Sequence, residues 1–192
     1  MLLATRCPGC DRVGPAPCAA CIAHMRRAEP VPVPTGLDDC LALLVHEGPA
    51  RSLVVGLKYR DARASVRWLA QGMAELVPEG AVDLVTWAPT TELRRRSRGF
   101  DHAELLARAV AAQLAVPCTA TLRRLPGPPQ TGRTLLERRD GPQFLASVNL
   151  VGRSVLTVDD VVTTGATFAA AARALRAAGA DHVVALAAAH PP

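Results

Sequence analysis

The chain has 192 residues, of which 49% are hydrophobic, so it is long enough for one domain with a buried core and a small appendage. Its 22 Lys and Arg residues exceed its 17 Asp and Glu residues, and the resulting charge of +5 suits a phosphate-rich ligand or a nucleic acid without establishing either. The sequence has no run of about eighteen apolar residues and no early apolar segment of signal-peptide length. It therefore predicts a cytoplasmic protein without membrane insertion.

Four cysteines near the start form two CxxC pairs, Cys7 with Cys10 and Cys18 with Cys21. Two such pairs can bring four thiolates around one soft divalent ion, and zinc is its natural occupant. A disulfide is disfavoured in a reducing cytoplasm, and a redox CxxC needs one pair rather than two. We therefore predict a structural zinc-ribbon-like module with a Pro-rich extended linker in residues 1–35.

Strands and helices alternate in residues 36–192, the expected second domain. Apolar runs predict strands at residues 40–48, 82–89, 118–125, 154–158 and 182–189. Apolar residues at three- and four-residue intervals predict helices at residues 62–77, 100–116 and 166–179, and residues 127–144 form a polar loop or short helix. Cys40 and Cys118 lie in apolar runs and are predicted to be buried small hydrophobes. The alternation predicts an α/β fold with a largely parallel twisted sheet flanked by helices.

Two adjacent carboxylates, Asp159 and Asp160, follow the fourth of these strands. A polar turn comes next and opens a helix; its residues are Thr163, Thr164, Gly165, Ala166 and Thr167. Ligands bind at the carboxyl ends of parallel strands, and N–H groups at a helix start hold phosphate. Carboxylates accept hydrogen bonds from the vicinal hydroxyls of a ribose, so a sugar phosphate fits both halves. A strand followed by a helix cap would use the same residue types but leaves the second acid unexplained.

A P-loop nucleotide site is excluded, because it needs a lysine in GxxxxGK[ST]. Lys58 is the only lysine, and it follows SLVVGL and precedes a tyrosine. No general acid or base can be singled out from the sequence, and His102 is as suited to cap the surface of its helix as to act in the chemistry.

The string VLTVDDVVTTGAT resembles the phosphoribosyl pyrophosphate (PRPP) signature of type I phosphoribosyltransferases. With the four cysteines, LKY at 57–59, RRRSRGF at 94–100, and Gln130 with ERR at 137–139, the chain resembles the ComF family of competence-associated phosphoribosyltransferase-like proteins. It departs from the pattern typical of that family at Asp101-His102, in place of Asn-Gln, and at Asp140-Gly141 after the ERR segment.

The resemblance implies a type I phosphoribosyltransferase-like fold and a role for each matching residue. Asp159 and Asp160 would be the catalytic residues that bind the ribose hydroxyls, and the turn at 163–167 would hold the 5-phosphate. Other residues would approach the pyrophosphate or close a lid over it, namely Lys58, Pro89, Arg94, Arg98, Gly99, Gln130 and Arg138. A solvated basic patch explains any single arginine of RRRSR equally well.

Three functions remain open from the sequence. The first is an enzyme that uses PRPP with Mg²⁺ to transfer phosphoribosyl to an unidentified nitrogenous base, with release of pyrophosphate. The second is a PRPP-sensing or structural component of DNA uptake, whose partners the resemblance places among competence proteins, including a helicase. The third is a nucleic-acid or protein adaptor built on the zinc module, which lacks the interleaved aromatics of single-strand binders. The intact PRPP string favours the first two.

Overall fold

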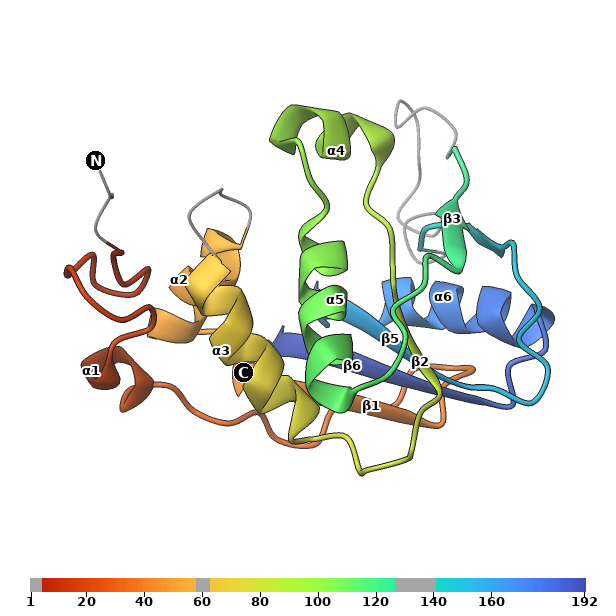
Figure 1. The fold of residues 1–192 in the computed structure, drawn as a ribbon, viewed down its shortest axis with the longest axis horizontal. Coiled ribbons are helices and arrows are strands. Elements are labelled where there is room, and N and C mark those ends of the chain that lie inside the picture. Colours follow the sequence, from red (N-terminus) through yellow and green to blue (C-terminus); the bar gives the residue numbers. More distant parts are fainter. Residues whose placement is uncertain (1–4, 58–62, 127–140) are drawn as a thin grey trace.

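A computed structural model describes residues 5–57, 63–126 and 141–192 of the chain (Figure 1). Its central sheet has four parallel strands in the order β1-β6-β5-β2. Their bounds are Asp39–Val45 for β1, His182–His190 for β6, Ser154–Val161 for β5 and Leu84–Trp87 for β2. Most residues of these strands are buried, as expected for parallel strands covered on both faces. The predicted parallel sheet is confirmed.

Helices cover both faces of the sheet (Figure 1). One face carries α2 (Gly48–Gly56), α3 (Arg63–Ala74) and α5 (His102–Leu114), and the other carries α6 (Ala166–Ala177). Successive strand residues alternate between the two faces. In β5, for example, Leu156 packs in the core cluster of α3 and α5, whereas Val155 packs against α6.

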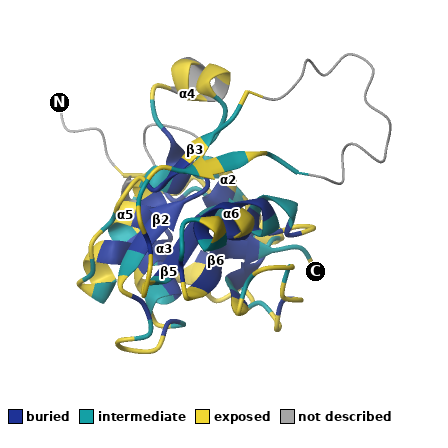
Figure 2. Cartoon of the chain, turned by 90° about the vertical axis from the view of Figure 1, so that its right-hand side faces the viewer, coloured by how far each residue is buried: buried dark blue, intermediate teal, exposed yellow. Residues whose placement is uncertain are grey.

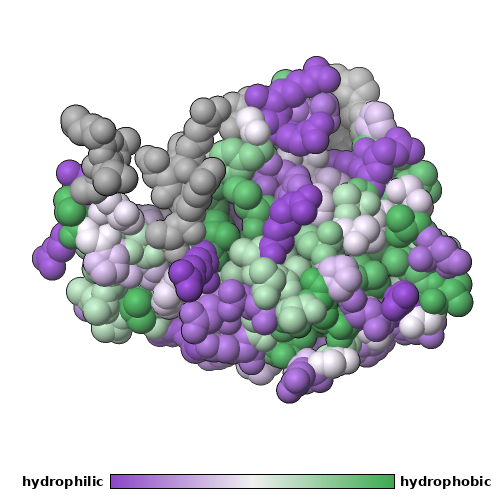
Figure 3. All heavy atoms as spheres, in the orientation of Figure 1, coloured by the Kyte–Doolittle hydropathy of each residue, from purple (hydrophilic) through white to green (hydrophobic). Residues whose placement is uncertain are grey.

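Two further elements lie beside this core. The strands β3 (Leu122–Arg124) and β4 (Phe144–Ala146) form a small antiparallel hairpin that packs against α6. The helix α4 (Glu92–Arg98) follows β2 and projects from the body of the protein (Figures 1 and 2). Hydrophilic residues gather over this helix (Figure 3).

The observed elements differ from the predicted ones in several places, and the short helix at Ala19–Ile22 and the strand β4 were not predicted. The first predicted strand ends at Val45, and the helix α2, which was not predicted, begins at Gly48. The segment after β2 contains the helix α4, which was also not predicted. The strand expected at 118–125 is confined to Leu122–Arg124. Cys40 is 3% exposed as predicted, whereas Cys118 is only partly buried against the core.

The segment before β1 is packed rather than free. After the short helix α1 (Ala19–Ile22), the chain pairs with the edge of β1, where Ala28 N–H donates to Leu43 O over 3.1 Å. Val31 is buried beside Phe168 of α6, and Pro34 contacts Gly165. The linker thus lies along the sheet and reaches the turn before α6.

An ionic contact lies at the amino end of the strands β1 and β6. Asp38 accepts from Val183 N–H over 2.7 Å and pairs with Arg176 at the end of α6. His182 Nδ1 lies 3.1 Å from the same Asp38 oxygen.

Among the described residues, no helix has the length and apolar character needed to cross a bilayer.

Candidate functional site

The paired carboxylates Asp159 and Asp160 lie at the carboxyl end of β5. The strand is buried from Val155 to Val158 and becomes half-buried from Asp159 onward. Asp159 Oδ1 accepts from Asp160 N–H over 2.8 Å, and Asp160 Oδ1 accepts from Val161 N–H over 2.9 Å. These bonds hold both side chains close to the strand end, where a ligand of a parallel sheet binds.

The turn at 163–167 lies between these carboxylates and α6. Gly165 is the N-cap of α6 and has φ 72°, a left-handed conformation that favours glycine. Thr163 and Thr164 are exposed, and Thr164 Oγ1 accepts from Ala166 N–H over 3.4 Å. The first N–H groups of a helix lack partners within the helix, so the start of α6 offers donors to an anion.

The loop after β2 meets the same edge of the sheet. Pro89 is half-buried there, and Thr90 N–H donates to Asp101 Oδ2 over 2.9 Å. The other oxygen of Asp101 accepts from Ala103 N–H over 3.0 Å and so caps α5. One buried carboxylate therefore joins the β2 loop to the start of α5.

His102 comes directly after this cap and reaches the acidic pair. Its Nε2 lies 3.3 Å from Asp160 Oδ2, and the residue is 8% exposed. His102 is therefore buried at the start of α5, because the first turn of this helix faces the end of β5. Each of His102, Asp159 and Asp160 offers one nitrogen or oxygen atom that could bind a metal ion, and these three atoms lie within 4.8 Å of one another.

Several negative groups converge at this point. Burial raises the pKa of Asp159 well above its ordinary value, and the nearby charges of Asp160 and Asp101 raise it further. A cation or a set of hydroxyl donors would relieve this repulsion. Carboxylate oxygens are the ligands that Mg²⁺ prefers, so Asp159 and Asp160 are suited to a Mg²⁺ ion that arrives with its ligand.

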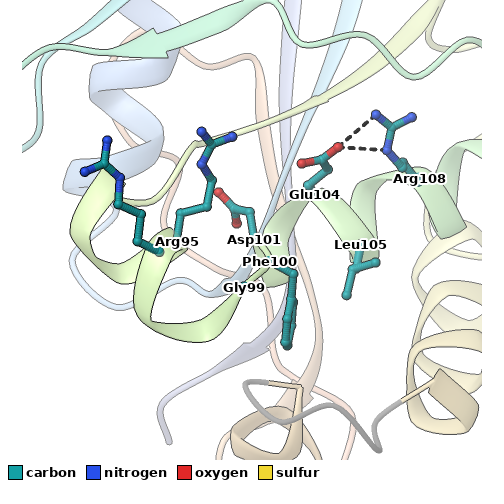
Figure 4. Close-up of a pocket in the computed structure, with 8 residues that line it drawn as sticks. Arg95, Gly99, Phe100, Asp101, Glu104, Leu105 and Arg108 are labelled. Carbon is teal, nitrogen blue, oxygen red and sulfur yellow. Dashed lines mark hydrogen bonds and ion pairs between the residues drawn. The ribbon is translucent and has the colours of Figure 1, made fainter.

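A pocket of about 450 Å³ adjoins the site between α4 and α5 (Figure 4). Its lining mixes guanidinium, carboxylate and apolar groups, from Arg95, Arg96, Gly99, Phe100, Asp101, Glu104, Leu105 and Arg108. Arg108 donates twice to Glu104 Oε1, over 3.0 and 2.8 Å, and its guanidinium lies 5.8 Å from the centroid of the Trp87 ring. Phe100 and Leu105 point to the opposite side from this ion pair (Figure 4). Asp101 belongs to both the pocket and the carboxylate cluster.

The structure brings together only some of the predicted site residues. The acidic pair, the turn at 163–167 and the loop at Pro89 meet at one edge, and Gly99 lines the adjoining pocket. Lys58, Gln130 and Arg138 lie outside the described residues. The side chains of Arg94 and Arg98 are also outside the described part, although both residues belong to α4.

Gly141, which belongs to the loop at 123–144 that is predicted to close over the site, lies beside the turn at 163–167. A Cβ built on Gly141 would lie 2.8 Å from the carbonyl oxygen of Ala166. The lid itself stays a prediction, because residues 127–140 lie outside the described part of the chain.

The four N-terminal cysteines form a second candidate centre. Their sulfur atoms lie within 4.8 Å of one another, and Cys10 Sγ is 3.7 Å from Cys18 Sγ. A tetrahedral zinc with bonds of about 2.3 Å places its sulfur ligands about 3.8 Å apart, so the cluster fits zinc. Burial raises the pKa of the Cys7 thiol, but hydrogen bonds from backbone N–H groups and neighbouring thiols outweigh it and lower this pKa to about 6. A lowered pKa favours the thiolate form of Cys7, and the thiolate is the form of cysteine that binds a metal ion.

The four-cysteine cluster packs against α2. A Cβ on Gly9 would lie 2.8 Å from Cys21 Sγ and 3.2 Å from Pro49, so the first CxxC turn closes tightly over both. Pro8 lies against Gly56 at the other end of α2. The cluster thus belongs to the packed structure rather than to a separate arm.

Residues 100–191 match the family model of the phosphoribosyl transferase domain. The match spans α5, the acidic pair, the turn and α6. The chain is 40% identical over 89 residues to an adenine phosphoribosyltransferase of Mycobacteroides abscessus, an alignment that covers 44% of this chain and 48% of that protein. The chain thus spans about half the length of this curated relative.

Two solved structures are similar at lower identity. A purine phosphoribosyltransferase of Pyrococcus horikoshii gives a TM-score of 0.42 at 19% identity, covering 63% of this chain and 71% of that chain. The glutamine PRPP amidotransferase of B. subtilis gives a TM-score of 0.46 at 20% identity, covering 69% of this chain and 30% of that chain.

Proposed function

We propose that this protein binds PRPP with Mg²⁺ and transfers its phosphoribosyl group to a nitrogenous base, with release of pyrophosphate. One observation carries the proposal: adjacent carboxylates and a helix-opening polar turn meet at the carboxyl edge of a parallel sheet, within the segment that matches the phosphoribosyl transferase domain. The adenine phosphoribosyltransferase that this segment resembles supports a base as the acceptor.

Each part of the site has a role in this proposal. Asp159 and Asp160 accept hydrogen bonds from the ribose hydroxyls, and the turn at 163–167 binds the 5-phosphate through backbone N–H groups and threonine hydroxyls. The loop from Pro89 into α4 and the pocket beside it face the pyrophosphate. A basic helix at this position suits a dense anion, because a guanidinium can make two parallel hydrogen bonds to phosphate.

The proposed reaction exchanges one bond at C1 of the ribose. The C1–oxygen bond to pyrophosphate breaks, and that oxygen keeps the electron pair. A ring nitrogen of the base forms the new bond to C1, and the proton that this nitrogen carried is released to solvent. Catalysis then depends on holding the ribose in place and on stabilising charge. Mg²⁺ would neutralise the leaving pyrophosphate, and the described residues that offer it oxygen ligands are Asp159 and Asp160.

We also propose an association with DNA uptake in the cytoplasm, where the cysteine cluster stays reduced and holds zinc. The support for this association is the resemblance of the cysteine pairs and the RGF segment to the ComF family. In the same setting, a PRPP-sensing component would keep the ligand site and lack turnover. The contact of Pro8 with Gly56 supports a structural role for the zinc module over an adaptor role.

The experiment that separates these functions measures pyrophosphate released from PRPP across a panel of purine and pyrimidine bases. A binding titration with PRPP and Mg²⁺ in the absence of base accompanies it. Release with one class of base supports the transferase, whereas binding without release from any base supports the sensor. Absence of PRPP binding would contradict both.

A further inference from the structure

The pair formed by His102 and Asp160 is the feature of the site that the proposed chemistry does not yet use. The two residues are far apart in the sequence and meet only because the first turn of α5 lies over the end of β5. We infer that His102 is a positioning residue that orients the Asp160 carboxylate toward a ribose hydroxyl. This inference rests on the proposed function.

The backbone around His102 is held on both sides. Asp101 uses one oxygen to cap α5 at Ala103 and the other to accept from Thr90 in the β2 loop. Both bonds have the ordinary length of an N–H···O hydrogen bond, 3.0 and 2.9 Å, and Asp101 is only 5% exposed. The imidazole that follows Asp101 therefore starts from a fixed backbone position.

The carboxylate of Asp160 is contacted at both of its oxygens. Oδ1 accepts from Val161 N–H over 2.9 Å, and Oδ2 lies 3.3 Å from His102 Nε2. With Oδ1 held by Val161 N–H, a hydrogen bond donated by His102 Nε2–H to Oδ2 would fix the plane of the carboxylate. Each oxygen can accept a second hydrogen bond, so the oriented carboxylate still has room for a ribose hydroxyl.

The surroundings of Asp160 explain why its carboxylate needs a neighbouring donor to stay oriented. The Asp160 side chain is 14% exposed and the His102 side chain 9%, so water competes little for their contact. Asp159 lies beside Asp160, and repulsion between the two carboxylates would turn an unrestrained Asp160 away from Asp159. A donor from His102 counters that repulsion and prepares the acceptor before the ligand arrives, which lowers the ordering cost of binding.

Calorimetric titrations of ribose 5-phosphate and inorganic phosphate test this role. In the variant His102→Leu, the imidazole is replaced by an apolar side chain that fills the buried space without a donor. We expect it to weaken ribose 5-phosphate binding by about tenfold, since a hydrogen bond to a charged group has this magnitude, and to leave phosphate binding unchanged. In His102→Gln, an amide N–H returns near the position of Nε2, and we expect affinity within about threefold of wild type.

A double variant shows whether His102 acts through Asp160. If it does, His102→Leu adds little to Asp160→Asn, because two residues in one hydrogen-bonded pair are not additive. The matched control is His182→Leu, which removes the other His–Asp contact of the sheet at its amino edge and is expected to bind both ligands normally. Should the leucine variant not fold, His102→Asn, whose amide is one bond shorter than that of glutamine, replaces it in the comparison.

The outcomes separate this inference from the function on which it rests. Equal weakening of both ligands in His102→Leu, failure of His102→Gln to restore affinity, or full additivity with Asp160→Asn would each overturn the positioning role. Loss of affinity in Asp160→Asn with none in His102→Leu overturns the inference and leaves the proposed function standing. Failure of the wild-type protein to bind ribose 5-phosphate or PRPP overturns the proposed function itself.

Discussion

Pro34 of the linker packs directly against Gly165 of the turn that precedes α6. A Cβ placed on Gly165 would lie 2.3 Å from Pro34 Cγ and 3.0 Å from Pro34 Cβ. Beside this contact, Val31 is buried with Val162 and Phe168, which flank the turn in the chain. The N-terminal linker therefore helps to shape the turn that we assign to the 5-phosphate.

The variant Gly165→Ala is expected to destabilise the protein and to weaken ribose 5-phosphate binding. A side chain at φ 72° costs about 1 to 2 kcal/mol, and the collision with Pro34 adds about 1 to 3 kcal/mol. The matched control is Gly80→Ala, at φ 71° with no atom within 4 Å of the new Cβ. Urea denaturation measures the difference, and Pro34→Ala should recover part of it. Equal losses in both alanine variants would show that the Pro34 contact is unimportant.

Each chain is expected to carry one zinc ion on its four N-terminal cysteines. Elemental analysis of anaerobically purified protein should give about one zinc per chain in the wild type and much less in Cys7→Ser, because three ligands hold zinc less well than four. The control Cys118→Ser, which lies outside the cluster, should retain the metal. Full zinc content in Cys7→Ser would show that the cluster is not the binding site.

The ligand-free protein is expected to become more stable at neutral pH when Asp159 is replaced by asparagine. A raised pKa means that the folded protein keeps its proton to higher pH than the unfolded chain does, so the free energy of unfolding falls as pH rises above about 3.9. Asparagine removes this cost and still accepts the Asp160 N–H.

Urea denaturation in the presence of EDTA checks this prediction. The advantage of Asp159→Asn over wild type should be present at pH 7 and should shrink as pH falls toward 4. Asp181→Asn, at an exposed position before β6, serves as the control. A less stable Asp159→Asn protein at pH 7 would contradict the assigned burial of that charge.

Local patterns in the sequence were enough to predict much of this structure. The apolar periodicity that predicted α3, α5 and α6 is matched by buried residues such as Leu69, Leu106 and Leu175. The two CxxC pairs predicted the clustering of their four cysteines, and the order of strand, two acids and turn predicted that the acids lie where β5 ends and α6 begins. In each case, the residues that identify the feature are close together in the chain.

The helices α2 and α4 were not predicted, although the sequence of α2 contains a common helix-start residue. The helix α2 has Pro49 in its first turn, a common start signal that the preceding apolar strand obscured. The helix α4 has charged residues over most of its length, so no apolar period indicated it.

Contacts between distant segments could not be predicted. His102 and Asp160 meet because α5 crosses the sheet beside β5, and nothing near either residue indicates that geometry. The same holds for Pro34 against Gly165, and for the strand order in which β6 separates β1 from β5. Such contacts depend on tertiary packing, and both of these side-chain contacts concern the candidate site.

The central claim is that the acidic pair and the turn form a PRPP site, and a calorimetric titration of PRPP with Mg²⁺ into wild type and Asp160→Asn tests it most directly. We expect saturable binding to the wild type, and a loss of about 1.5 to 3 kcal/mol of binding free energy in the variant, as for a hydrogen bond to a buried charge. The control Asp38→Asn, at the opposite edge of the sheet, should bind as the wild type does. No binding to wild type, or equal affinity in wild type and Asp160→Asn, would contradict the claim.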